Sequence, residues 1–150
     1  MVNYQHPDLT QHPPRSGRVR LGGFAHLPRL LDKARAFLTG KNADYQYNCP
    51  LDQRFFAFTG INPDAMLAEI KTDKCDFELL EWVLANCTPL RAPYEIAQWS
   101  AWLDSFGPGG AEGHEWVVEV IKANAPRRTD IRSFCDILDL DDYVSYGGKS

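Results

Sequence analysis

The chain is a succession of short segments in which apolar residues recur at the spacing of an α-helix. The first segment spans residues 27–39, and Gly40 supplies its C-terminal stop. Further segments of this kind are 52–59, 62–71, 76–86, 93–106, 112–124 and 129–138. Proline and glycine separate them, most clearly in the loop 107–110. Because short helices depend on tertiary packing, the pattern predicts a mostly α, compact domain of about seven short helices.

Local signals set the expected helix boundaries. Asn62-Pro63-Asp64 combines a capping amide, a first-turn proline and an acid at the positive end of the helix dipole. We expect Asp52 to cap the second helix and Thr129 to cap the last one, with residues 143–146 briefly extended after it. In the first helix the apolar stripe predicts Arg29 and Lys33 on the far face. The sequence shows no convincing pair of strands.

Length and composition indicate a single domain over residues 1–150. A domain of this size buries roughly 68–70% of its unfolded surface, which is enough for a core without disulfides or a metal. No apolar segment follows Met1 and none is long enough to span a membrane. No C-x-x-C pair occurs among the four cysteines. We therefore expect a cytoplasmic protein with free thiols, outside the membrane, with no metal and no cofactor.

Charge is distributed unevenly along the chain. Residues 1–41 hold seven Lys/Arg and two acids, a net charge of +5, whereas residues 42–150 hold nine Lys/Arg and eighteen acids, a net charge of −9. The overall charge of −4 argues against a nucleic-acid-binding protein, in which a basic domain is expected. A basic head on an acidic body predicts either an anion site or packing of the head on the body through ion pairs.

The best candidate site is the segment 13–23, which we call the Arg/Gly arm and expect to be extended, after a flexible stretch at 1–12. Arginine forks suit carboxylate or phosphate, and glycine lets a ligand approach the backbone. The segment is neither a P-loop nor a dinucleotide-binding turn. Alternatively, the arginines pair with acids of the body and the glycines form a turn. The predicted ligand-binding residues are Arg15, Arg18, Arg20, Gly22, Gly23 and Arg29.

Three further features are weaker candidates. The acids at 136–142 do not fit a calcium loop, and pairing with the basic arm is the preferred interpretation. Cys49 precedes a short helix, whose dipole favours a thiolate, and His26 and His114 are the histidines that could serve as its base. The four tryptophans lie mostly at core spacing, and an exposed indole would indicate a binding surface.

Several sequence motifs extend this description. They are PPRS at 13–16, RVRLGG at 18–23, LPRLLDKARA at 27–36, YNCPLDQRF at 47–55, EIAQWSA at 95–101 and LDLDDYVS at 138–145. Together they resemble a family of small bacterial proteins that is defined as a domain of unknown function. The resemblance spans about residues 8–149 and implies a single bacterial domain. It implies no reaction, no cofactor and no assigned site.

The leading functional hypothesis is a non-enzymatic module that binds a small anionic ligand or an acidic partner through its N-terminal arginines. The alternative is an enzyme that uses Cys49 with a histidine, or an Asp/Arg pair, in a cleft. A third hypothesis is a protein–protein adaptor that uses an exposed tryptophan. The sequence leaves the oligomeric state open.

Overall fold

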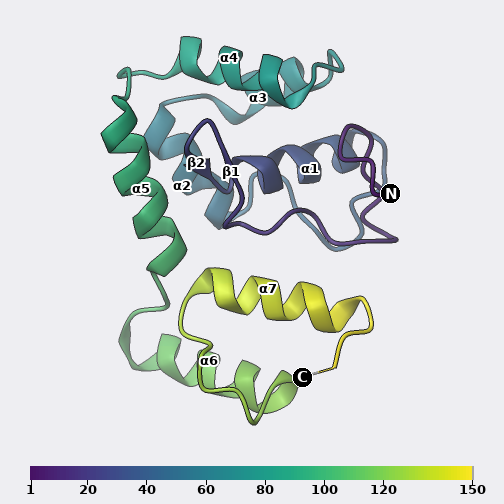
Figure 1. The fold of residues 1–150 in the computed structure, drawn as a ribbon, viewed down its shortest axis with the longest axis vertical. Coiled ribbons are helices and arrows are strands. Elements are labelled where there is room, and N and C mark those ends of the chain that lie inside the picture. Colours follow the sequence, from purple (N-terminus) through teal and green to yellow (C-terminus); the bar gives the residue numbers. More distant parts are fainter. Residues whose placement is uncertain (150) are drawn as a thin grey trace.

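A computed structural model describes residues 1–149 of the chain (Figure 1). Seven helices make the protein 54% helical, and one small two-stranded sheet accompanies them within the described residues. The elements are, in chain order, β1 (Arg20–Leu21), β2 (Phe24–Ala25), α1 (Leu27–Leu38), α2 (Pro50–Thr59), α3 (Pro63–Ile70), α4 (Asp76–Asn86), α5 (Pro93–Ser105), α6 (Gly110–Asn124) and α7 (Phe134–Ser145). The mostly α architecture expected from the apolar spacing is thus confirmed.

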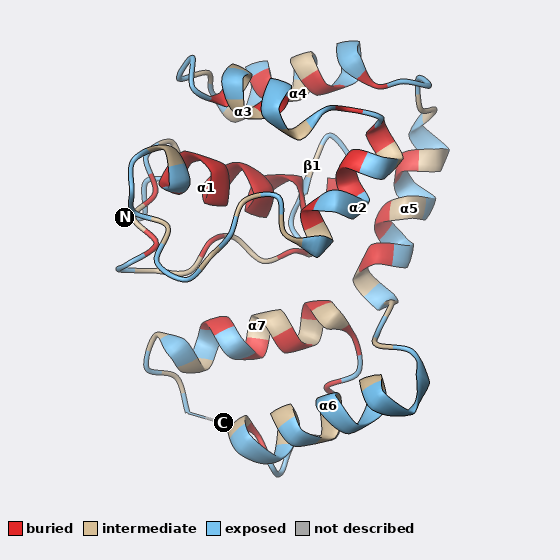
Figure 2. Ribbon diagram, turned by 180° about the vertical axis from the view of Figure 1, so that it is seen from behind, coloured by how far each residue is buried: buried red, intermediate tan, exposed pale blue. Residues whose placement is uncertain are grey.

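Helix α1 is buried on nearly all sides (Figure 2). One side carries Leu27, Leu30 and Leu31 into the main core, as its apolar spacing predicts. The opposite side carries Arg29 and Lys33, which are only 3% exposed. The two cations lie on the far face from the apolar stripe, as expected, but this face is buried as well, because α7 and α2 cover it and supply the carboxylate partners Asp142 and Asp52.

The sheet is an antiparallel hairpin of two strands with two residues each, which the sequence did not indicate. Gly22 and Gly23 form its turn with φ of 57° and 85°. A turn with two positive φ angles matches the twist of paired strands and strongly favours glycine. Ser100 of α5 holds the hairpin, because its hydroxyl donates to the Gly23 carbonyl at 2.7 Å and accepts from the Ala25 amide at 2.9 Å.

Two expected helix boundaries need correction. Helix α2 begins at Pro50 with Cys49 as its N-cap, so Asp52 lies inside the helix and is fully buried. Helix α7 begins after Ser133 and not after Thr129, because Ser133 and Asp136 form a reciprocal capping box. It remains helical to Ser145, and therefore through most of the segment 143–146 that was expected to be extended. By contrast, Asn62 caps α3 as predicted, accepting from two backbone amides.

The helices surround two separate hydrophobic clusters. The larger includes α1 to α5 and the hairpin, and the smaller lies between α6 and α7 around Ile131, Ile137 and Leu140. In Figure 1, α5 leads from the first group of helices down to α6 and α7. The N-terminal segment is also packed against the body, because Leu9 is fully buried and its carbonyl accepts a hydrogen bond from the Tyr146 hydroxyl.

Candidate functional site

All three arginines of the Arg/Gly arm are bound to carboxylates. Arg15 donates to Asp32 at 2.7 Å and to Asp76 at 2.7 Å. Burial opposes the charge of Arg15, but the hydrogen bonds that its guanidinium donates to these two carboxylates outweigh this effect and raise its pKa. Arg20 is paired with Asp104 at 2.6 Å on a more exposed part of the surface. These guanidinium groups already have the partners that an anionic ligand would provide.

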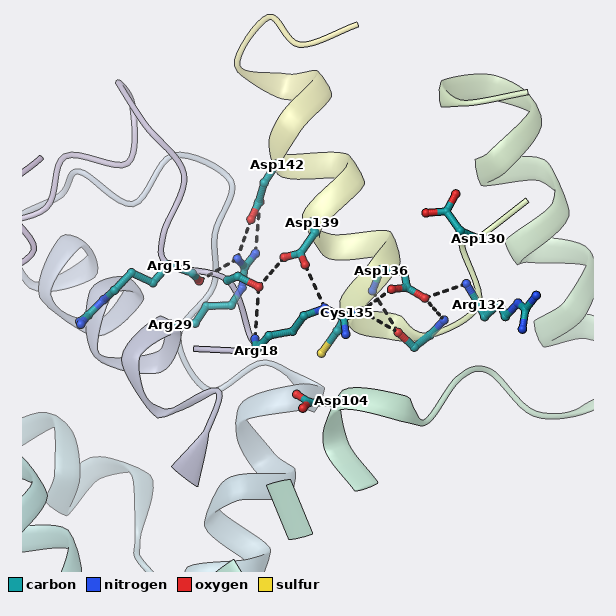
Figure 3. A network of polar contacts seen from close by, with 12 residues as sticks. Arg15, Arg18, Arg29, Asp104, Asp130, Arg132, Cys135, Asp136, Asp139 and Asp142 are labelled. Atoms are coloured by element: carbon teal, nitrogen blue, oxygen red, sulfur yellow. Dashed lines mark hydrogen bonds and ion pairs between the residues drawn. The ribbon is translucent and has the colours of Figure 1, made fainter. Parts of the chain in front are cut away.

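Arg18 attaches the arm to the start of α7 (Figure 3). Its guanidinium pairs with Asp136 and also donates to Asp139 at 3.2 Å. The Ser16 hydroxyl donates to the other oxygen of Asp139 at 2.6 Å. The predicted contact between the basic arm and the acidic C-terminal segment is therefore confirmed.

Arg29 makes a second and more deeply buried connection to α7. Its guanidinium points at Asp142 and donates to the two carboxylate oxygens at 2.6 and 3.2 Å (Figure 3). The side chains are 3% and 9% exposed. The Tyr45 hydroxyl donates to the same carboxylate at 2.7 Å. Burial raises the pKa of Tyr45, and this hydrogen bond raises it further. We call the Arg18 and Arg29 contacts to α7 the ionic latch.

The two glycines predicted as ligand donors have a packing role in the hairpin. A Cβ atom at Gly22 would overlap the side chain of Leu80 on α4, and a Cβ at Gly23 would lie 3.3 Å from Ile96 on α5. The backbone approaches other helices at this turn, so the close approach that glycine permits is used within the fold.

A cavity of about 480 Å³ lies on the buried cation side of α1, between α1, α2 and α7. We call it the groove. Helix α7 contributes one face to it, through Phe134, Leu138, Asp141 and Ser145. At 1.5 Å per residue this face is about 16 Å long, so the groove is elongated along the helix. Its opposite wall comes from α1, α2 and the loop between them, through His26, Arg29, Lys33, Cys49 and Arg54.

One wall of the groove holds a compact cluster of buried polar groups. The Lys33 ammonium donates to both Asp52 oxygens at 2.8 and 2.9 Å, to the Gln46 carbonyl at 3.0 Å and to Cys49 Sγ at 3.1 Å. The Asp52 carboxylate also accepts a hydrogen bond from His26 Nε2 at 2.7 Å. Burial opposes ionisation of Asp52, but the hydrogen bond from His26 and the charge of Lys33 outweigh it and lower its pKa.

Burial lowers the pKa of the His26 imidazole, which favours its neutral form. The single ring proton lies on Nε2, which faces an ionised acceptor, and Nδ1 therefore carries a lone pair. Within residues 1–149 that Nδ1 has no hydrogen-bond partner. His26 contacts Asp52, and Cys49 contacts Lys33, so His26 does not form the Cys–His pair of the alternative enzyme hypothesis. The other candidate, His114, is exposed on α6.

One end of the groove combines a cation with aromatic rings. The Arg54 guanidinium lies 4.7 Å from the ring centre of Phe106 and 5.6 Å from that of Trp102. Phe106 packs on Phe134 at 4.9 Å, and both rings line the groove. Across the described part of the chain, no carboxylate forms an ion pair with Arg54.

The other end of the groove is acidic. Asp141 comes from the last turns of α7 and Asp44 from the loop before α2, with Ser145 and Tyr146 beside them. Neither acid takes part in an ion pair within residues 1–149. The groove is thus polarised, with an unpaired guanidinium and rings at the Phe134 end and unpaired carboxylates at the Ser145 end.

Of the arginines predicted as ligand-binding residues, Arg29 alone lines the groove. Sequence reasoning missed Arg54 because it is one of several cations with no distinctive spacing. It singled out Cys49, but not the lysine beside it, because Lys33 lies outside the apolar stripe. Trp102 and Trp116 are 42% and 45% exposed, as the adaptor hypothesis requires of at least one tryptophan.

Most of the acids at 136–142 are paired with arginines. Three of the four take part in the ionic latch. In the part of the chain that the structure describes, no group of three or more His, Cys, Asp or Glu side chains is placed to hold a metal ion. No helix among residues 1–149 is both long and apolar enough to cross a membrane.

These features define a mostly α protein with an elongated groove between two helical clusters joined by an ionic latch. The sequence matches a family model described as domain of unknown function (DUF5069) over residues 11–144, and the chain belongs to this family. The match confirms the expectation that the chain belongs to a family defined as a domain of unknown function. A comparison with curated proteins finds no match to the chain.

Proposed function

We propose that the protein binds a small organic anion in the groove, with the anionic group at Arg54 and the apolar body against Phe106, Phe134 and Leu138. The observation that carries the proposal is the unpaired Arg54 guanidinium beside the aromatic end of a 480 Å³ cavity. Cavities of about 300–1,000 Å³ that combine apolar walls with a few polar groups are typical of small-molecule sites.

The charges around the groove support Arg54 as the anion-binding residue. Arg29 and Lys33 each have a buried carboxylate partner, so their charges are balanced within the fold. A ligand carboxylate at Arg54 would form a charge-assisted, bidentate contact of the kind arginine favours. The arm arginines bind their own carboxylates instead. The anionic ligand expected from the sequence is therefore proposed again, at another arginine.

The acidic end of the groove adds to the expected ligand chemistry. Asp44 and Asp141 favour a hydrogen-bond donor or a cationic group on the part of the ligand that reaches them. An elongated molecule with an anionic, ring-bearing end and a donor-bearing end fits both ends of the groove. A polyanion fits the Arg54 end only.

Binding of anilinonaphthalene sulfonate, a fluorescent aromatic anion, tests the proposal on the folded protein. We expect saturable fluorescence that Arg54→Met weakens about tenfold, equivalent to about 1.4 kcal/mol, and that Leu138→Trp abolishes by filling the groove. Arg127→Met is the matched control, because Arg127 is exposed and lies outside the groove. Circular dichroism verifies that each variant is folded. Equal binding by the wild type, Arg54→Met and Leu138→Trp would refute the proposal.

A further inference from the structure

We propose that Cys49 is a covalent attachment site in the groove, whose thiolate adds to the β-carbon of an electrophilic α,β-unsaturated carbonyl compound. The inference uses the groove of the proposed function but rests on different residues. It starts from the four partners of the Lys33 ammonium, one of which is the Cys49 sulfur at 3.1 Å.

The Lys33 ammonium is buried and has three protons. Four acceptors surround these protons: both Asp52 oxygens, the Gln46 carbonyl and Cys49 Sγ. A buried charged donor needs a good acceptor for each proton, and a neutral thiol is only a weak acceptor. The positive charge 3.1 Å from the sulfur stabilises negative charge that develops on it. The thiolate is also the nucleophilic form of cysteine, and neighbouring cations stabilise it.

The position of Cys49 in the fold adds to this effect. It is the N-cap of α2, with φ of −68° and ψ of 169°, so its side chain lies at the positive end of the helix dipole. It is partly accessible and lines the groove. His26, which is 1% exposed and has an unpartnered Nδ1, lines the same cavity and is bonded to the same Asp52. The sulfur therefore belongs to a buried polar cluster beside a cavity that can hold a ligand.

The class of electrophile follows from the walls of the groove. None of the other three cysteines lines the cavity, so no second thiol is present there to complete a disulfide cycle. Conjugate addition of a thiolate to an enone needs no second thiol. Apolar and aromatic walls suit a carbon skeleton, and Arg54 suits a carboxylate on it. We therefore infer an aromatic or aliphatic enone that carries an acidic group.

The addition balances without an oxidant, a reductant or a leaving group. The thiol first gives its proton to solvent. The thiolate then forms a carbon–sulfur bond at the β-carbon, and the electron pair of the carbon–carbon double bond moves to the α-carbon and carbonyl as an enolate. A proton from solvent at the α-carbon completes a thioether, so the net reaction is thiol plus enone to adduct.

Cys75 provides a matched control within the same molecule. It is the N-cap of α4 with φ of −73° and ψ of 169°, almost the backbone geometry of Cys49. It is more exposed, but its neighbour across the first turn is the Glu78 carboxylate, which accepts from the Cys75 amide at 2.8 Å. The two thiols therefore differ in accessibility, which favours Cys75, and in the neighbouring charge, which is a cation at Cys49 and an anion at Cys75. Burial raises the pKa of Cys87 and Cys135, so these two should react slowly.

The first experiment measures the alkylation rate of each cysteine in the folded wild-type protein by substoichiometric iodoacetamide and peptide mass spectrometry. We expect Cys49 to react at least about tenfold faster than Cys75 at every pH between about 6 and about 8. A Cys49 rate equal to or below that of Cys75 across this range would overturn the inference. Iodoacetamide is neutral, so this result does not depend on anion binding at Arg54.

The second experiment removes the cation. The double variant Lys33→Met with Asp52→Asn removes both buried charges together, which avoids leaving Asp52 without its ammonium partner. Cys49 should then react no faster than Cys75, whose own rate stays unchanged and serves as the internal standard. An unchanged Cys49 rate in a folded variant would contradict the role given to Lys33. If the variant does not fold, the ratio of the two rates in the wild type decides.

The third experiment uses 3-benzoylacrylate, an aromatic enone with a carboxylate, and its neutral ethyl ester. We expect a single thioether at Cys49 that Cys49→Ser abolishes, and a preference for the acid over the ester that Arg54→Met removes. Addition at Cys49 without that preference would support the attachment site and refute anion recognition at Arg54. Absence of a Cys49 adduct with both compounds would refute the attachment site and leave the sulfonate-binding test of the groove independent.

Discussion

Replacing Arg29 by methionine tests whether the buried half of the ionic latch holds α7 on the body. The Arg29 side chain is 3% exposed and donates two hydrogen bonds to Asp142, whose side chain is 9% exposed. Methionine keeps much of the apolar stem, so the variant removes the charge with little change in packing. The Asp142 carboxylate then remains buried with the Tyr45 hydroxyl as its remaining charge-stabilising donor.

Breaking a buried ion pair by removing one partner costs about 3–5 kcal/mol, because it leaves an uncompensated charge. We therefore expect Arg29→Met to lower the free energy of unfolding by about 3 kcal/mol or more in urea titrations. Removing the second charge as well, with Asp142→Leu in the same chain, should restore most of the loss, since an apolar pair of similar volume replaces the ions. Hydrogen exchange should localise the effect of the single variant to α7.

The exposed pair Arg128–Asp130 is the matched control, because its side chains are 44% and 62% exposed. Arg128→Met should leave the urea midpoint unchanged within error, since exposed ion pairs contribute little. A loss below about 1 kcal/mol for Arg29→Met, or a double variant as unstable as the single one, would refute the argument that the buried pair holds α7 in place.

Three further predictions concern other parts of the fold. Burial lowers the pKa of His26 below its usual 6.5, so the unfolded chain binds a proton more readily than the folded one, and the free energy of unfolding should fall as the pH drops below about 6.5. In His26→Asn, where asparagine tolerates the φ of 69°, denaturation measured as a function of pH should show a smaller loss of stability over this range. Gly60→Ala should destabilise far more than Gly40→Ala, because both glycines have φ near 70° but an added Cβ clashes with a backbone carbonyl at Gly60 alone; thermal melts that lower both midpoints equally would contradict this. The double change Arg18→Met with Arg20→Met should lower the free energy of unfolding by about 1–2 kcal/mol in urea titrations. This loss is smaller than for Arg29→Met, because both side chains are 39% exposed and screened by solvent. An unchanged free energy of unfolding would show that the arm is not held by its ion pairs.

The helices were largely predictable because their signals are local. Apolar residues at a spacing of three and four define each buried face. Asn62 begins α3 and Gly60 ends α2 through contacts with their own neighbours in the sequence. The last helix shows the limit of this reasoning. Thr129 and Ser133 are both residue types that can cap a helix. The helix begins after Ser133 because Asp136 completes a capping box with it.

The candidate site was predictable only in part, because it depends on partners that are far apart in the sequence. Cys49 could be named from its place before a helix, but Lys33 lies sixteen positions earlier, and nothing local indicates that its ammonium meets the sulfur. Arg54 looks like any surface cation until the other arginines are seen with their carboxylates. The groove itself exists because α7 returns to cover the charged side of α1.

The sequence alone therefore determined the mostly α class, most of the helix positions and the attraction between a basic head and an acidic end, since these follow from local spacing and net charge. Only the tertiary structure decided which cations are neutralised and which remain free. Charge pairing is set by long-range geometry, as in Arg29 with Asp142 across 113 positions. The same geometry converts the presumed binding arm into part of the ionic latch and leaves Arg54 and Cys49 facing the groove.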